Sequence, residues 1–144
     1  MAAPLPAKLQ AVLFKKIFGY DRTLGAKSKV VVLVLDDGGN TEEVVGAFAA
    51  LGISASAVKP TSLEGQSGSV VYFTKASSIV KSYCSKNKAL GISGTPDLAN
   101  SGDAAISLRA RADGRPEIVV NLPLAKSQGQ DLSADLLGLA TVIQ

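Results

Sequence analysis

The stretch KVVVLVLDDGGNTEEVVGAFAALG, residues 29–52, decides the fold class. Its first half is an unbroken run of β-branched and leucine side chains, which is typical of a parallel strand buried on both faces. Two glycines then lead into a helical pattern, where Asn40 is placed to act as the N-cap with Glu43 three residues later. Gly52 is placed to end that helix. A strand followed by such a helix predicts a βαβ unit.

The same alternation continues along the chain. We expect parallel strands near 30–35, 53–58, 69–74 and 88–92, with a helix over 76–87 before the last of them. Neither internal repeats nor a linker interrupt this pattern. The sequence therefore predicts an α/β fold with a three-layer, mostly parallel mixed sheet, in one domain spanning residues 1–144.

An amphipathic helix is predicted at the start, over residues 6–20. Its apolar stripe is expected to contain Leu9, Val12, Leu13 and Ile17, widened by Phe14 and Phe18. The solvent-facing side of this predicted helix carries Lys8, Lys15 and Lys16. A basic amphipathic helix can also lie on a membrane surface. With three flanking lysines, we favour the interpretation that this helix packs on the sheet.

The pattern changes after residue 103, where two alternating runs flank a turn. We expect an antiparallel hairpin, 104–111 with 116–122, added at one edge of the sheet. Core residues must face core residues, because a one-residue slip would turn every side chain over. A three-residue loop, 112–114, satisfies this condition and needs Gly114 in the left-handed conformation. This register pairs Leu108 with Ile118, Ile106 with Val120, and Arg109 with Glu117.

Composition narrows the function classes. The 144 residues carry 15 basic and 12 acidic side chains and only 5% aromatic residues, so neither charge nor stacking surface indicates a nucleic-acid partner. Histidine is absent, which removes the commonest general base and metal ligand. No apolar run reaches the length of a membrane span. The start MAAPLPAKLQ lacks the features of an intact signal peptide, and we expect a mature N-terminus with an added methionine, flexible over residues 1–8.

Three groups of residues remain as candidates for a metal, phosphate or catalytic site. Asp36 and Asp37 follow a parallel strand and could hold Mg²⁺, but the strand at 69–74 ends without the acid that a phospho-acceptor site needs. DGGN, residues 37–40, could cradle a phosphate, although the two adjacent carboxylates of Asp36 and Asp37 would repel it. The serines lack a histidine, and a pairing of Lys75 with Ser77 or Ser78 is the remaining possibility. We therefore expect no enzyme, and no catalytic, cofactor or metal residues.

The region from 70 to 142 carries an ordered set of motifs. They are VVYFT at 70–74, a glycine-containing loop at 97–102, VNL at 120–122, Ala125, and the leucine-rich tail LSADLLGLA at 132–140. In this order and spacing they resemble the YfiR-like family of small exported bacterial proteins. The first predicted helix also looks like that family's first helix, so the resemblance covers roughly residues 9–142.

The resemblance implies a periplasmic α/β protein that tends to form a homodimer. Characterised members bind the periplasmic domain of a membrane diguanylate cyclase and repress it, without being enzymes. By this resemblance the hallmark residues are structural. Asn121 would tie the strand end to the tail through its amide, and the leucines 132, 136, 137 and 139 would close the core. The hallmark set is Gly114, Asn121, Leu122, Ser133, Leu136 and Leu137.

Two other function classes stay open. The domain could sense a ligand in a pocket near the 94–102 loop, or it could be a structural partner in an envelope assembly. Cys84 adds one departure from the family, whose characterised members carry disulfides. It is the single cysteine of this chain, and it shares the apolar stripe of Ile79, Val80 and Tyr83. We expect a buried, unreactive thiol, with a disulfide between two copies as the alternative.

Overall fold

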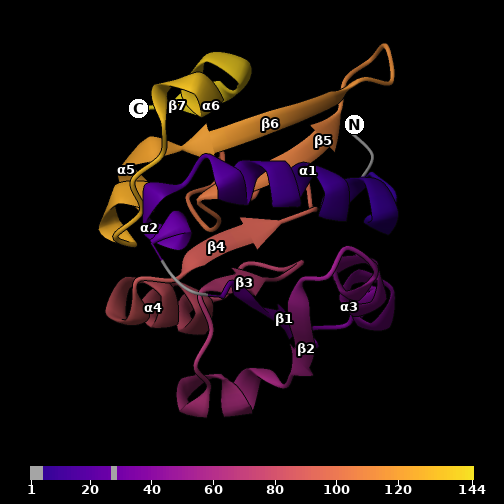
Figure 1. The fold of residues 1–144 in the computed structure, drawn as a ribbon, viewed down its shortest axis with the longest axis vertical. Helices are drawn as coiled ribbons and strands as arrows, with labels where there is room; N and C mark the ends of the chain where they lie inside the picture. Colours follow the sequence, from indigo (N-terminus) through magenta and orange to yellow (C-terminus); the bar gives the residue numbers. More distant parts are fainter. Residues whose placement is uncertain (1–4, 27–28) are drawn as a thin grey trace.

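The computed structural model describes residues 5–26 and 29–144, and these form an α/β fold on a seven-stranded mixed sheet (Figure 1). The strands are β1 (Val31–Leu35), β2 (Ser54–Val58), β3 (Val70–Tyr72), β4 (Leu90–Ser93), β5 (Ile106–Ala110), β6 (Pro116–Asn121) and β7 (Thr141–Ile143). Their order across the sheet is β2-β1-β3-β4-β5-β6-β7. The first five run parallel, while β6 and β7 run parallel to each other and antiparallel to the rest.

The helices connect these strands. They are α1 (Ala7–Gly19), α2 (Arg22–Gly25), α3 (Thr41–Ala50), α4 (Ser78–Asn87), α5 (Leu122–Ser127) and α6 (Ala134–Leu139), with a 3-10 helix η1 (Pro60–Gly65). The predicted α/β class with a mostly parallel mixed sheet is confirmed. Of the segment 1–8, residues 1–4 lie outside the described residues, whereas Leu5 is buried and Ala7 begins α1.

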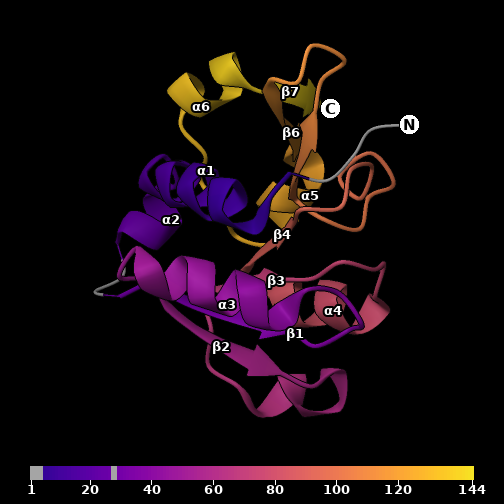
Figure 2. The ribbon, with the colours of Figure 1, turned by 90° about the vertical axis from the view of Figure 1, so that its right-hand side faces the viewer.

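The sheet separates two hydrophobic cores. One core lies between the sheet and helices α1 and α3, and it is built around Phe14, Phe18 and Phe48. The other lies under α4 and η1 and contains Phe73 and Cys84. Figure 2 shows α1 and α3 on one side of the sheet and α4 on the other. Adjacent residues of β3 face opposite cores, because side chains alternate along a strand. The result is the three-layer arrangement expected from the sequence.

The β5–β6 hairpin has the register that the alternation predicts. Leu108 pairs with Ile118, Ile106 with Val120, and Arg109 with Glu117. The Arg109 guanidinium donates to the Glu117 carboxylate. Gly114 has a φ of +83°, the left-handed conformation that the third loop position requires. Core-to-core matching together with loop length therefore determined the pairing correctly.

One detail of the hairpin differs from the prediction. We expected β6 at the edge of the sheet, but β7 lies beyond it and pairs with it in parallel. The C-terminal segment was expected to be a packing tail ending in helix. After α6, Thr141–Ile143 instead extends and covers the free edge of β6. An uncovered edge exposes unpaired backbone groups, and β7 pairs with those of β6.

The predicted stripe of α1 was wrong on one side. Phe14, Ile17 and Phe18 are buried as expected, but Leu9 is 36% exposed and Val12 is 40% exposed. The buried face instead includes Ala11 and the polar Gln10. Two phenylalanines one turn apart set which face meets the sheet, because they bury the most apolar area. On α4, Val80, Tyr83 and Cys84 are buried but Ile79 is exposed.

The capping prediction for α3 was right in position but not in the side-chain contact. Asn40 is the N-cap residue, but its side chain makes no hydrogen bond to the first turn. Gly52 follows the helix with a φ of +78°, as expected. Asp36 instead accepts a hydrogen bond from the Thr41 hydroxyl at 3.4 Å. No helix in the described ranges has both the length and the apolar character that crossing a membrane requires.

Candidate functional site: the groove between α1 and α3

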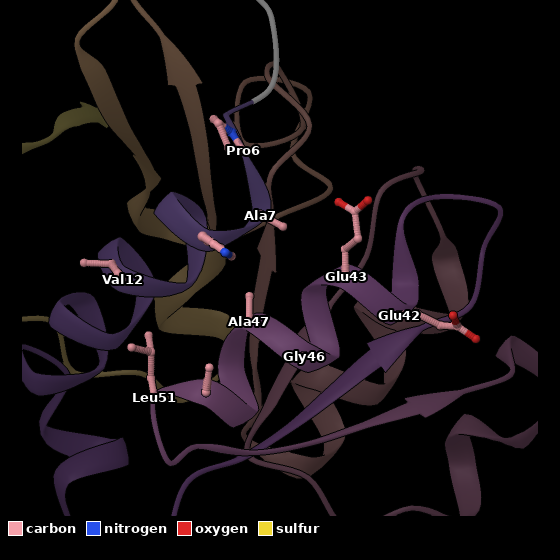
Figure 3. A pocket seen from close by; sticks show the side chains of 10 residues that line it. Pro6, Ala7, Val12, Glu42, Glu43, Gly46, Ala47 and Leu51 are labelled. Atoms are coloured by element: carbon pink, nitrogen blue, oxygen red, sulfur yellow. The ribbon is translucent and has the colours of Figure 1, made fainter.

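An open groove of about 790 Å³ runs between helices α1 and α3 on the outer side of the first core (Figure 3). We call it the α1–α3 groove. Its walls are almost wholly apolar, and its lining consists of Pro6, Ala7, Lys8, Val12, Glu42, Glu43, Gly46, Ala47, Ala50 and Leu51. Both helices begin at the same end of the groove, where Pro6 and Ala7 lie near Glu43.

The sequence of α3 explains why this space is open. Its inner face carries Val44 and Phe48, which are buried against the sheet. Its outer face carries Gly46 and Ala50, which are exposed and too short to fill the gap toward α1. Larger side chains at these two positions would close the groove. The groove is therefore open because short residues occupy the outward-facing positions of α3.

The rim of the groove is charged and asymmetric. Lys8 stands exposed on the α1 wall, and Glu42 and Glu43 stand exposed on the first turn of α3. Acidic residues at that turn are favourable because the helix dipole is positive there. In the part of the chain that the structure describes, the ion pairs do not involve these three side chains. The charges are thus available to a molecule that enters the groove.

Helix α1 is held on the sheet by a buried polar contact behind the groove. Gln10 is 3% exposed, and its side-chain amide donates to the Leu5 carbonyl at 2.6 Å. Its oxygen accepts the Tyr72 hydroxyl, also at 2.6 Å. Burial raises the pKa of Tyr72 to about 12, so the phenol stays protonated and keeps donating. This contact fixes the position of the α1 wall.

The hallmark residues do not line the groove. Asn121 caps α5 by accepting from the Leu124 amide at 3.2 Å, and its own amide donates to the Ala99 carbonyl at 3.0 Å. It therefore joins the end of β6 to α5 and to the 97–102 loop. Leu122 is the half-buried first residue of α5. Gly114 is in the hairpin loop.

The tail residues are also structural. Ser133 caps α6 by accepting from the Leu136 amide at 3.3 Å. Leu136 is fully buried in the first core, and Leu137 packs against it. Leu139 was expected to close the core but is 63% exposed, because α6 is short and turns that side chain outward.

The acids after β1 have structural roles. Asp37 accepts the Thr74 amide at 2.7 Å and the Thr74 hydroxyl at 2.6 Å, which ties the ends of β1 and β3 together. A side chain on Gly39 would meet Thr74 at 2.8 Å, which explains the glycine there. This strand order places the switch point of the sheet between β1 and β3, a usual place for ligands. Protein contacts occupy it here.

Two of the serines have structural roles. Ser77 caps α4, and Ser93 accepts the Thr95 amide. In the described residues, no group of three acidic or cysteine side chains is placed to hold a metal ion. Two smaller pockets are lined mainly by 66–69 and by 39–43, so neither they nor the groove contain residues of the 94–102 loop.

Sequence reasoning did not find the groove. The signal was present in the pattern GAFAA, 46–50, where short residues occupy the outward positions of a helix. Without knowledge of which helix lies beside α3, such a pattern reads as ordinary surface. Exposed Leu9 and Val12 were missed because they were assigned to the core.

Comparisons with known proteins leave the function open. No family model matches the chain, and no curated protein matches it. One solved structure with a similar arrangement is an alanine–glyoxylate aminotransferase from Nostoc sp., with 12% sequence identity and a TM-score of 0.49. The match covers 94% of this chain and 54% of that one, so the chain spans about half its length. A likeness at this level supports no conclusion about activity.

Proposed function

We propose that this chain is a non-catalytic periplasmic regulator that binds and represses a membrane signalling protein, the periplasmic domain of a diguanylate cyclase. The observation that carries the proposal is the α1–α3 groove. It is an apolar surface with an exposed charged rim, and exposed apolar surface of this kind suits contact with protein. On this proposal the regulator works as a homodimer.

The motif positions give a second support. The residues that resemble the YfiR-like pattern serve as caps and core contacts: Asn121 joins β6, α5 and the 97–102 loop, and Ser133 caps the helix that buries Leu136. A regulator of this kind needs a rigid frame and a surface, with no reacting groups. The motifs supply the frame, and the groove is an apolar surface for contact with protein.

The test has two arms. The gene is deleted in its own host, and cyclic-di-GMP is measured with and without a plasmid copy of the chain. We expect the level to rise on deletion and to return to normal on complementation. In parallel, the tagged chain is released from the periplasm and incubated with solubilised inner membranes. A diguanylate cyclase should be recovered, and its output should fall when the purified chain is added.

Three results would contradict the proposal. The chain could fractionate with the cytoplasm, the deletion could leave cyclic-di-GMP unchanged, or the recovered cyclase could be insensitive to the added chain. A small molecule that stabilises the purified chain in a thermal screen, together with unchanged cyclic-di-GMP, would favour the ligand-sensing alternative.

A further inference from the structure

We propose that the α1–α3 groove is the contact between two copies of this chain, in which α1 of each copy lies over α3 of the other. This inference rests on the proposed function at one point, namely that the groove receives protein. It adds the identity of the occupant and the orientation of the contact.

Shape is the first argument. Helix α1 presents two exposed apolar side chains, Leu9 and Val12, which its own core does not use. Helix α3 presents Gly46 and Ala50, which leave the space that such side chains could enter. Small residues at a helix contact allow close approach of the two axes. One copy therefore carries both the ridge and the gap that the other requires.

Charge selects the orientation. Both helices begin at the same end of the groove, as Figure 3 shows. If the two-fold axis runs along the helices, α1 lies parallel to α3 of the second copy, and Lys8 meets Glu42 and Glu43 of that copy. Lys15 then comes to the C-terminal end of the second α3, whose last turn has no basic residue of its own.

The other two-fold arrangement is unfavourable. An axis across the helices would place α1 antiparallel on α1 of the second copy. Lys15 and Lys16 would then lie near Lys8 of that copy, and like charges in contact are costly. A two-fold contact repeats every interaction, so the favourable arrangement contains the Lys8 contact twice.

A membrane surface is a poorer occupant. Anionic lipid would attract Lys8, Lys15 and Lys16 but repel Glu42 and Glu43, which share the same surface. A second copy matches both signs at once. The groove therefore fits a copy of this chain better than it fits a bilayer.

The experiment uses charge reversal and mixing. The full chain, Lys8→Glu, and the double variant Glu42→Lys with Glu43→Lys are compared by size exclusion with light scattering over a concentration series. We expect the unaltered chain to dimerise and each variant alone to dimerise at least about 10-fold more weakly. An equimolar mixture of the two variants should form a heterodimer, because one of its two contacts keeps the original signs and the other has both signs reversed, so both are attractive.

Matched controls keep the result interpretable. Lys81 is an exposed residue of α4, on the opposite side of the sheet from the groove. Lys81→Glu makes the same charge change there and should leave dimerisation unchanged. Ala50→Arg fills the groove at an exposed position and should give a monomer. Circular dichroism and thermal melting confirm that each variant is folded before its mass is interpreted.

The proposal is overturned by a monomeric parent chain at high micromolar concentration, by variants that dimerise as the parent does, or by a mixture that stays monomeric. These outcomes are separate from those of the function test. A chain that dimerises through the groove but leaves cyclic-di-GMP unchanged contradicts the proposed function alone. A dimer that all the groove variants leave unchanged contradicts the groove contact alone. A monomer that represses a cyclase contradicts the groove contact and the homodimer, and leaves the repression itself supported.

Discussion

The two faces of the sheet are covered in different ways. On one face, α1 and α3 lie side by side, and their phenylalanines form a ring cluster with centroids 6.2–6.4 Å apart when Tyr72 is included. On the other face, α4 and η1 cover a core that includes Phe73 and Cys84. Two helices that lie side by side on a sheet leave a space between them on the outer side. Here short residues on α3 keep that space open as the α1–α3 groove. The groove thus arises where two helices share the packing over one face of the sheet.

Each face also buries a weak acid whose pKa is raised by burial. Tyr72 lies under α1 and has Gln10 as a hydrogen-bond partner. Cys84 lies on α4, and burial alone raises the pKa of its thiol to about 12. One group takes part in a polar contact that holds a helix in place, and the other acts as an apolar filler. This difference leads to different expected effects when each is changed.

The largest effect is expected from Phe48→Ala in the ring cluster. Phe48 is fully buried between Phe14 and Phe18, so its removal leaves a cavity that α3 can fill only in part. We expect a loss of about 3–5 kcal/mol in the free energy of unfolding, measured by urea denaturation. The exposed neighbour variant Ala49→Ser should cost less than about 0.5 kcal/mol. A loss below about 1 kcal/mol for Phe48→Ala would show that the ring cluster does not hold this face together.

Tyr72→Phe should have the next largest effect. It removes the hydroxyl and leaves the buried Gln10 oxygen without a donor, which costs roughly 1–3 kcal/mol. The folded-state pKa of Tyr72, about 12, lies above its ordinary value of 10.0. Its contribution to stability is therefore full below pH 10 and is lost as the pH rises through 12. The variant should lose this part of the alkaline decline, measured by denaturation at several pH values between 8 and 11.5. An unchanged slope would mean that the phenol is solvated in the folded state.

Much of the fold on both faces of the sheet could be predicted from the sequence. The features that could not be predicted have physical causes. The run VVLVL, 31–35, and the alternation around Gly114 determined the parallel core and the hairpin register, because strand periodicity leaves few options. The rotation of α1 was wrong because apolar side chains occur nearly all around that helix. Only the sheet decides that Phe14 faces inward and Val12 outward. The groove depends on α1 and α3, which residues 20–40 separate in the sequence, so no local pattern contains it.

The β5–β6 hairpin also carries a contact near the surface, between Glu117 and Arg109, which offers a test outside the two cores. Glu117 accepts from Arg109 and from the Thr141 hydroxyl, and these contacts lower the pKa of its carboxyl below the usual 4.5. Its stabilising contribution is therefore full above pH 4.5 and is lost as the pH falls through the folded-state value. Glu117→Gln should cost less than about 1 kcal/mol at pH 7, and the difference should vanish in acid. A loss comparable to that of Tyr72→Phe would place this pair among the core contacts.

The smallest effect is expected from a change of redox conditions. Cys84 is a free cysteine with no exposed surface, packed in the core under α4, and its raised pKa keeps it a thiol at neutral pH. The thiolate is the reactive form, so the group should react only when the surrounding structure opens. Melting temperature and the mass on non-reducing gels should be the same with and without dithiothreitol, and a thiol reagent should label Cys84 at neutral pH only after urea is added. A dimer band that disappears on reduction, or a melting shift of several degrees, would show instead that α4 opens to expose this thiol. The core under α4 would then open in the folded protein, and Cys84 would not be a simple apolar filler.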